Sequence, residues 1–411
     1  GGTVAIIGLA MLLVVAQLVV LKMLPFDNKS EFQVIVDMPE GTTIEQTARV
    51  LDAMAETIER VPEVTDYQVY AGTASPINFN GLVRQYYLRS DSNAGDIQVN
   101  LVDKHHRKRS SHEIARSVRD ELAAIGREFG ASVKIAEVPP GPPVMSPIVA
   151  EIYGPDYEEQ KLLGRRLEGI FHDTPDIVDI DSSVEADAQR LIIEVDRQRA
   201  ALLGVPQQRI AAILQMALNG EDVTYVHQAR ERYPIPVRLD LPVSSKADLE
   251  ALLALEVRSQ SGQRVPISEV AEVRKAGWDD AVYHKDLLPV VFVTADMAGR
   301  LDSPLYGMFT LSGKIDELAS AGAPIEQRYI SQPGNPYYFS MKWDGEWQIT
   351  YETFRDMGLA YSVGLILIYL LVVAQFRSYL LPLIIMAPIC LLYTSDAADD
   401  RTCGYLGGGG G

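Results

Sequence analysis

Two long uncharged apolar runs, about 335 residues apart, limit what this chain can fold into. Residues 4–21 (VAIIGLAMLLVVAQLVVL) and residues 357–374 (MGLAYSVGLILIYLLVVA) each contain 18 residues without a charge. This is close to the length that a helix needs to cross the hydrocarbon core of a bilayer. A third apolar run, residues 380–392, follows the short turn QFRSY. The pattern predicts a multi-pass α-helical membrane protein with a large soluble insert between its first two spans.

The first and third apolar runs each have a competing interpretation. Residues 4–21 lack the basic leader and the small-residue cleavage site of a secretory signal, so we expect a true span. The third run has only 13 residues and ends in YTSDAADDRTCGYLGGGGG, whose charges are costly in hydrocarbon. We therefore expect residues 380–392 to begin a truncated span and residues 393–411 to be an artefactual tail. The chain is then expected to be a fragment at both ends.

The charge and the cysteine content of the chain limit the cellular compartment that it can occupy and the partners that it can bind. Arg377 lies in the short turn, which the positive-inside tendency places in the cytoplasm, so the insert is expected in the periplasm. A net charge of −18 argues against a nucleic-acid partner, because phosphate binding requires a basic face. The only cysteines, Cys390 and Cys403, lie in or beside the suspect tail. An insert without cysteine suits an oxidising compartment and excludes disulfides, cysteine–zinc sites and thiol catalysis.

The insert contains an internal repeat of strand–helix–strand units. The segments VPEVTDYQV and TPDIVDIDS end two predicted helices in the same way, with Pro62 and Pro175 113 residues apart. Each repeat has the order β-α-β-β-α-β of a ferredoxin-like unit. The first has expected strands at 32–37, 65–71, 97–102 and 132–138, and helices at 44–60 and 111–129. The second, with strands at 147–153, 178–183, 289–296 and 326–330, is interrupted by residues 197–278.

The order span, split double repeat, span, tight turn and span resembles the second half of a resistance-nodulation-division (RND) efflux permease. The resemblance covers roughly residues 1–390 and fits the hydrophobe/amphiphile (AcrB-like) branch. Several short motifs agree in order and spacing. They are Leu24-Pro25 with Asp27, Phe32, Pro39-Glu40-Gly41-Thr42, Pro62-Glu63-Val64, Gly154-Pro155-Asp156, Ala201-Leu202-Leu203-Gly204-Val205 and Arg377-Ser378-Tyr379.

The resemblance implies a division of the chain. The expected parts are a transmembrane helix (1–22), a first porter subdomain (23–145), a second porter subdomain (146–196 and 279–342), a docking or funnel subdomain (197–278), an interfacial segment (343–356), a transmembrane helix (357–374), the start of another (380–392) and the tail (393–411). Trp343, Trp347, Ile349 and Tyr351 give the interfacial segment an amphipathic character, and tryptophan and tyrosine favour the membrane interface.

The resemblance also implies a function. It implies a homotrimer in the bacterial inner membrane that exports hydrophobic or amphiphilic compounds by proton-driven antiport. Its partners would be a periplasmic adaptor protein and an outer-membrane channel. The family's proton-relay charges lie outside this fragment. No catalytic residue, cofactor or metal site is expected, and the chain is not expected to be an enzyme.

The candidate substrate site is the segment of residues 71–89 (AGTASPINFNGLVRQYYLR), between two strands of the first repeat. The family has a flexible loop here that separates two drug pockets. The predicted contacts with apolar substrates are Tyr70, Phe79, Leu82 and Tyr86, and the residues expected to give mobility are Gly72, Pro76 and Gly81. The alternative is an ordinary long hairpin with a buried phenylalanine.

The basic run KHHRKR, residues 104–109, with His112 suggests a metal site, but its four cations oppose a metal ion. We expect a solvated basic turn before a helix that Ser110 or Ser111 caps. Two other functions remain open. A heavy-metal RND exporter would require methionine or carboxylate ligands along its path, and no methionine cluster stands out in the insert. A two-span periplasmic binding or sensor protein would explain the insert but not the third apolar run.

Overall fold

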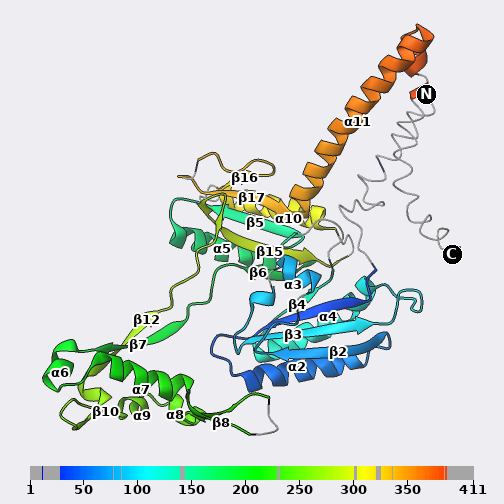
Figure 1. The fold of residues 1–411 in the computed structure, drawn as a ribbon. Coiled ribbons are helices and arrows are strands. Elements are labelled where there is room, and N and C mark those ends of the chain that lie inside the picture. The colour runs from blue at the N-terminus through cyan, green and yellow to red at the C-terminus, as the bar shows by residue number, and fades with distance from the viewer. Residues whose placement is uncertain are drawn as a thin grey trace. The chain divides into compact units, whose positions relative to one another are not determined.

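The computed structural model describes residue 12 and residues 28–76, 78–84, 86–138, 144–228, 232–299, 303–320, 325–335, 337–383 and 385–386. The chain forms two compact units. One consists of Gly1–Glu185 with Val282–Gly411, and the other is Ala186–Ala281. The first unit holds two α+β subdomains and a long apolar helix. The second unit interrupts the sequence of the second subdomain (Figure 1).

The first subdomain has one sheet with two helices on one face (Figure 1). Its sheet has the order β2-β3-β1-β4, in which β1 lies antiparallel to β3 and β4, as in a ferredoxin-like unit. The predicted β-α-β-β-α-β order is present, with a short helix and a 3₁₀ turn added between β2 and β3. The elements are β1 (Glu31–Asp37), α2 (Ile44–Glu59), β2 (Val64–Ala71), α3 (Phe79–Arg84), η1 (Tyr86–Leu88), β3 (Ala94–Leu101), α4 (Ser111–Phe129) and β4 (Ser132–Ala136).

Alternation along the strands explains the core of the first subdomain. Side chains at every second position point to one face of a strand, and on β1 these are Phe32, Val34 and Val36, all buried against α2 and α4. The opposite face of β1 carries Glu31, Gln33 and Asp37 together with the buried Ile35. Helix α4 begins with a capping box, in which the Ser110 side chain accepts from the Glu113 backbone and the Glu113 side chain accepts from the Ser110 backbone. The predicted serine cap is therefore present at Ser110.

The second subdomain repeats this plan with an additional strand. Its sheet has the order β16-β17-β5-β15-β6, and α5 and α10 contribute to one apolar core with it. A small hairpin, β13 (His284–Lys285) with β14 (Leu288–Pro289), precedes β15. The other elements are β5 (Ile148–Tyr153), α5 (Tyr157–His172), β6 (Ile177–Ser182), β15 (Val291–Met297), α10 (Pro304–Ser320), β16 (Glu326–Arg328) and β17 (Ser340–Gly345).

Strand β17 corrects the expectation of an interfacial segment starting at residue 343. It pairs antiparallel with β5 and separates β5 from β16, which was expected to close the sheet. Trp343 on β17 is fully buried, its ring stacks on Phe171 with centroids 6.5 Å apart, and its Nε1 donates to Gln327 Oε1 at 3.0 Å. Trp343 therefore belongs to the core of the second subdomain and not to a membrane interface.

The inserted unit begins earlier than the expected docking subdomain of residues 197–278. Strand β7 (Gln189–Val195) was assigned to the second porter subdomain, but it pairs antiparallel with β12 inside the inserted unit. A small core around Ile210, Val257 and Ile267 holds the unit together. Its other elements are α6 (Arg197–Leu202), α7 (Gln207–Asn219), β8 (Glu221–Val226), β9 (Ile235–Leu239), α8 (Val243–Lys246), α9 (Leu249–Leu253), β10 (Glu256–Arg258), β11 (Arg264–Pro266), η2 (Ile267–Glu269) and β12 (Ala271–Gly277).

One helix among the described residues is long and apolar enough to cross a membrane. Helix α11 (Glu346–Phe376) has an 18-residue window with a mean hydropathy of 2.3 and contains the predicted span of residues 357–374 (Figure 1). Residues 346–356 are its first three turns rather than a separate segment. The expected span of residues 4–21, apart from residue 12, and the tail of residues 393–411 lie outside the described residues, and the run of residues 380–392 is described only in part.

Candidate functional site

The segment between β2 and β3 folds over the polar face of the first sheet. Asn78 donates to Gln98 Oε1 at 3.0 Å and lies 3.4 Å from Gln33 Oε1, so the segment covers the face that the helices leave free. The same asparagine accepts from the backbone of Gly81 at 2.7 Å and supports the turn of α3. The predicted long connection therefore contains ordered structure rather than an open hairpin loop.

The predicted pocket residues take separate positions on this segment. Tyr70, on β2, donates its hydroxyl to Gln68 at 2.8 Å, and Leu82, on α3, is 58% exposed. Tyr86 begins η1 and is partly buried. For Phe79, the first residue of α3, only the backbone is described. No contact among the described side chains joins these residues into one pocket, and their role as substrate contacts stays a prediction.

The residues expected to give mobility also differ in their surroundings. Gly72 has a positive φ of 71°, and a Cβ there would lie 2.8 Å from Ile44 Cδ1, so glycine is required at this turn. Gly81 lies inside α3, and Pro76 is exposed. Only Gly72 thus has a backbone conformation that other residues disfavour.

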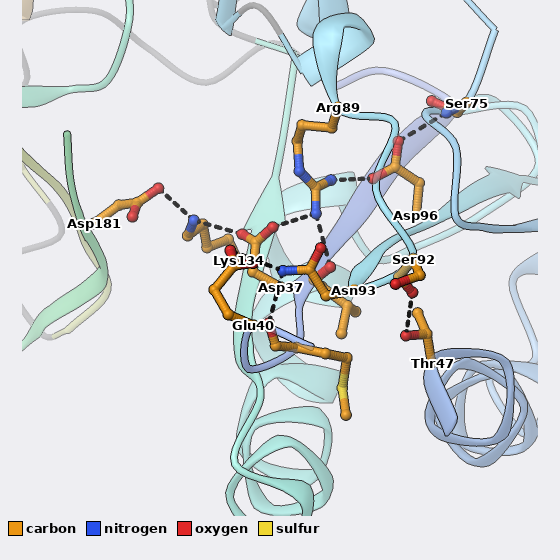
Figure 2. A network of polar contacts seen from close by, with 12 residues as sticks. Asp37, Glu40, Thr47, Ser75, Arg89, Ser92, Asn93, Asp96, Lys134 and Asp181 are labelled. Atoms are coloured by element: carbon orange, nitrogen blue, oxygen red, sulfur yellow. Dashed lines mark hydrogen bonds and ion pairs between the residues drawn. The ribbon is translucent and has the colours of Figure 1, made fainter. Parts of the chain in front are cut away.

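A buried carboxylate fastens both ends of the segment to the sheet (Figure 2). Asp96 on β3 is fully buried, and its Oδ2 accepts from the Ser75 backbone at 2.8 Å and from Gln33 Nε2 at 3.0 Å. Its Oδ1 accepts from Arg89 at 2.6 Å, and Arg89 also donates to the Val36 carbonyl at 2.7 Å. Burial raises the pKa of Asp96, against the lowering effect of its bonds to Ser75 and Arg89.

The same network continues into the second subdomain (Figure 2). Arg89 forms an ion pair with Asp37 at the end of β1, and Asp37 accepts from Lys134 of β4 at 3.0 Å. Lys134, which is buried, also forms an ion pair with Asp181 on β6. Burial acts to raise the pKa of Asp37, but Lys134 and Arg89 hold it below its ordinary value. One chain of charges therefore leads from the Gly72–Asn93 connection to the second subdomain.

Other oppositely charged side chains also lie where the two subdomains contact each other. Arg119 of α4 forms an ion pair with Asp179 of β6, whose second oxygen lies 3.4 Å from the Ile135 backbone nitrogen. Burial raises the pKa of Asp296 on β15 to about 6, with repulsion from Asp179 adding to the effect and Arg84 and Arg119 opposing it. The first subdomain thus contributes Arg84, Arg119 and Lys134, and the second contributes Asp179, Asp181 and Asp296.

Sequence reasoning missed this contact, although the strand patterns indicate the polar faces that take part in it. Its acids and Lys134 sit at the polar positions of alternating strands, as in IVDIDS of β6 and SVKIA of β4. The alternation shows that each sheet has a polar face. It does not show that the two faces meet, because the pairing joins residues 44 to 60 positions apart.

A second charged cluster lines a cavity of about 590 Å³ on the polar face of the second sheet. Glu151 on β5 is fully buried, accepts from the Tyr153 hydroxyl at 2.9 Å and pairs with Lys285, which also pairs with Asp344. Lys342 lies 3.6 Å from Glu151. Burial, followed by the neighbouring Asp344 carboxylate, raises the pKa of Glu151 to about 7. None of the seven predicted pocket residues lines this cavity.

Within the described ranges, no three histidine, cysteine, aspartate or glutamate side chains are grouped so that they could hold a metal ion. In the basic run of residues 104–109, Arg107 donates to the Lys29 carbonyl at 2.6 Å and Arg109 to Glu63 Oε1 at 2.7 Å. His112 Nδ1 lies 2.8 Å from Glu137 Oε1, but among the described residues these two side chains belong to no such group of three.

The fold is shared with a solved efflux pump. The model superposes with a TM-score of 0.67 on the X-ray structure of a heavy metal efflux pump, with 19% sequence identity, over 94% of this chain and 38% of that chain. This likeness shows a common fold, which includes the two α+β subdomains. The sequence profile of the AcrB/AcrD/AcrF family matches residues 2–395, and the chain belongs to this family of RND permeases. The resemblance to RND permeases seen in the sequence is confirmed, and the hydrophobe/amphiphile branch stays a prediction.

The similar proteins are distant in sequence, and their names describe different functions. The swarming motility protein SwrC of Bacillus subtilis is 23% identical over 236 residues, which cover 57% of this chain and 20% of that protein. The cobalt-zinc-cadmium resistance protein CzcA of Cupriavidus metallidurans is 20% identical over 281 residues, 66% of this chain and 25% of that protein. The multidrug resistance protein MdtC of Pectobacterium carotovorum is 20% identical over 304 residues, 73% of this chain and 28% of that protein. The chain thus spans a fifth to about a quarter of these relatives.

Proposed function

We propose that this chain is part of an inner-membrane efflux transporter that exports hydrophobic or amphiphilic compounds by proton-driven antiport. It acts as a transporter rather than as an enzyme, with its α+β subdomains in the periplasm. It works as a homotrimer together with a periplasmic adaptor and an outer-membrane channel. Membership of the AcrB/AcrD/AcrF family and the likeness to MdtC support this proposal.

The contact between the two α+β subdomains is the observation that best supports a transport cycle. Each subdomain has its own apolar core, and the contact between them includes ion pairs such as Lys134–Asp181 and Arg119–Asp179. Subdomains joined by polar contacts can separate without exposing a large apolar area, whereas a shared apolar core would hold them together. The arrangement suits a cleft that opens to admit a substrate and then closes.

The β8–β9 hairpin of the inserted unit supports assembly into a homotrimer. Every residue of both strands is exposed, including the apolar side chains. Exposed apolar patches on a soluble part of a protein commonly mark interaction sites. The exposed apolar residues are Val223, Tyr225, Val226, Ile235, Val237 and Leu239. A second copy of the chain is the partner that we propose for this hairpin.

A heavy-metal exporter is the second candidate, because CzcA and the solved pump carry that description. Such a pump must offer ligands to its metal ion along the path. In the part of the chain that the structure describes, the carboxylates Asp179 and Asp181 are already paired with Arg119 and Lys134. This occupation favours organic compounds over metal ions. The two-span binding or sensor protein receives no support from the family.

A reversible crosslink tests whether the contact must open during transport. Lys134→Cys with Asp181→Cys places one thiol on each of the two subdomains, and Lys134→Cys with Ile35→Cys places two thiols at directly paired positions of β4 and β1 inside the first subdomain. The gene that carries this sequence would be expressed with an adaptor and a channel in a pump-deficient strain. We expect export of a fluorescent amphiphile to stop only when the crosslink across the two subdomains is oxidised, and to return after reduction. Full export with that crosslink oxidised would contradict an opening cleft.

The substrate class is tested in the same cells. Expression is expected to raise the minimal inhibitory concentration of amphiphilic dyes and detergents at least fourfold and to leave that of Co²⁺, Zn²⁺ and Cd²⁺ unchanged. The reverse pattern would favour the metal exporter. Collapse of the proton gradient with an uncoupler should abolish export in either case, and export that survives the uncoupler would contradict antiport.

A further inference from the structure

The basic turn between β3 and α4 has exposed lysines and histidines and partly buried arginines. Lys104, His105, His106 and Lys108 are exposed, while Arg107 and Arg109 are partly buried. Neither lysine takes part in an ion pair within the described residues. Asp103 shapes the turn by accepting from the His105 backbone at 2.9 Å, and this hydrogen bond, aided by the nearby cations, lowers the pKa of Asp103.

The two arginines hold the turn in place. Arg107 donates to the Val102 carbonyl at 3.0 Å, to the Arg109 carbonyl at 2.5 Å and to the Lys29 carbonyl at 2.6 Å, and it also bonds to the Asn28 side chain. Arg109 forms an ion pair with Glu63. Because the arginines satisfy internal acceptors, the lysines and histidines form a fixed outward surface rather than a loose basic loop.

The strand register places this surface at the end of the subdomain where β1 begins, which follows the first predicted span in the sequence. Strand β3 runs antiparallel to β1, with Glu31 opposite Asn100, and Leu101 donates to the Ser30 carbonyl at 2.8 Å. The turn that follows β3 therefore lies beside the residues that precede β1. Asn28, which the turn contacts, is seven residues beyond the apolar run of residues 4–21, a reach of no more than about 25 Å.

We propose that the turn of residues 103–109 binds the phosphate headgroups of anionic phospholipids and holds the first subdomain against the membrane surface. The proposal rests on the membrane placement in the proposed function. A local group of cations stands out in a chain with a net charge of −18, and it lies beside Asn28 and Lys29, which follow the first predicted span in the sequence. Basic segments next to a membrane span bind anionic lipids, and each lysine near the surface strengthens binding roughly fivefold.

The test uses the whole chain in lipid nanodiscs of phosphatidylcholine that contain increasing fractions of phosphatidylglycerol. Hydrogen–deuterium exchange reports protection of the backbone amides of residues 103–109. The test variant is Lys104→Gln with Lys108→Gln. The matched control is Arg274→Gln with Lys275→Gln, which removes the same charge from exposed positions on β12 of the inserted unit.

We expect protection of the turn to rise with the phosphatidylglycerol fraction and to weaken as salt is raised, because salt screens exposed charges. The Lys104/Lys108 variant should need at least a fivefold higher fraction for half-protection, and the Arg274/Lys275 control should behave as the wild type. Exchange that is independent of lipid charge, or equal loss in both variants, would overturn the proposal and leave the transport function standing. Failure of the chain to enter nanodiscs would instead overturn the membrane placement, and this proposal with it.

Discussion

Lys134 of β4 binds the carboxylate of Asp181 on β6, so that one ion pair joins strands of two subdomains with separate cores. The lysine is buried and also bonds to Asp37 in its own subdomain at 3.0 Å. Lys134 therefore links the contact between the two subdomains to the polar residues of the first sheet. A change at this position should affect both the stability of the first subdomain and its hold on the second.

Lys134→Met tests this coupling. The substitution leaves Asp37 with Arg89 alone, and we expect the free energy of unfolding to fall by about 1–3 kcal/mol, less than for a fully buried pair because both carboxylates are partly exposed. Urea-induced unfolding followed by circular dichroism gives the value. Lys275→Met, at an exposed position, should stay within about 0.5 kcal/mol of the wild type. Unchanged stability of Lys134→Met would mean that the pair contributes nothing net.

Arg89→Ala should release the connection between β2 and β3. The substitution removes the charged partner of Asp96, which is fully buried, and we expect a loss of about 2–4 kcal/mol in stability. Hydrogen exchange of residues 72–93 should become faster while exchange in α4 changes little. Arg49→Ala, on the exposed side of α2, is the control. Exchange that stays slow in Arg89→Ala would show that Ser75 and Gln33 suffice to hold the segment.

Trp343→Ala should destabilise the second subdomain by about 3–5 kcal/mol, because a large buried ring that packs on Phe171 is lost. Trp343→Phe keeps a ring but leaves Gln327 without its donor, and a loss of about 1–2 kcal/mol is expected. Trp278→Ala, at a position 59% exposed, should change stability by less than about 1 kcal/mol. Denaturant unfolding monitored by circular dichroism distinguishes the three. Equal effects of Trp343→Ala and Trp278→Ala would argue against a core position for Trp343.

Glu151 should make stability depend on pH. Its pKa of about 7 in the folded chain lies above the ordinary value of 4.5, so the folded state holds a proton that the unfolded state releases. Stability that is present at low pH is therefore lost as pH rises through 7. Asp296, with a pKa of about 6, acts in the same direction at lower pH, which makes pH 6 to 8 the informative window.

Between pH 6 and 8 we expect the wild type to lose about 1 kcal/mol of stability through Glu151. Glu151→Gln should remove most of this slope, since the amide does not titrate. Glu56→Gln, at an exposed position on α2, should retain it. Unfolding free energies at four pH values in this window provide the measurement. A slope that survives in Glu151→Gln would assign the titration to another group.

Much of the fold could be predicted because its signals are local. Alternating strands such as EFQVIVD, the serine cap of α4 and the two Pro-containing breaks indicated the order of the first repeat, and its boundaries agree within a few residues. Strand β17 could not be predicted in the same way. Trp343 and Trp347 share a spacing that suits an amphipathic segment, and the partner of β17 is β5, almost 200 residues earlier.

The candidate site was predicted less well than the fold. The position of the connection between β2 and β3 follows from its length, and the requirement for glycine at Gly72 is visible only from its positive φ in the folded chain. The charged contact depends on two polar sheet faces that meet, a tertiary fact with no local signal. The branch of the family also stays a prediction, since relatives described as multidrug and metal resistance proteins match the chain about equally.

Helix α11 follows β17 without an intervening loop, so the helix moves with the sheet that contains β17. Gly345, the last residue of β17, has a φ of 80° and leaves no room for a Cβ against the Ser146 and Pro147 carbonyls, while the backbone N–H of Glu346 donates to the Pro147 carbonyl at 3.1 Å. The close packing at this junction leaves little room for the helix to bend relative to the sheet. With 31 residues the helix is a rod of about 46 Å, so a rotation of the sheet and the helix together by about 10° displaces the far end of the helix by about 8 Å. The sheet of the second subdomain and helix α11 thus form a single lever.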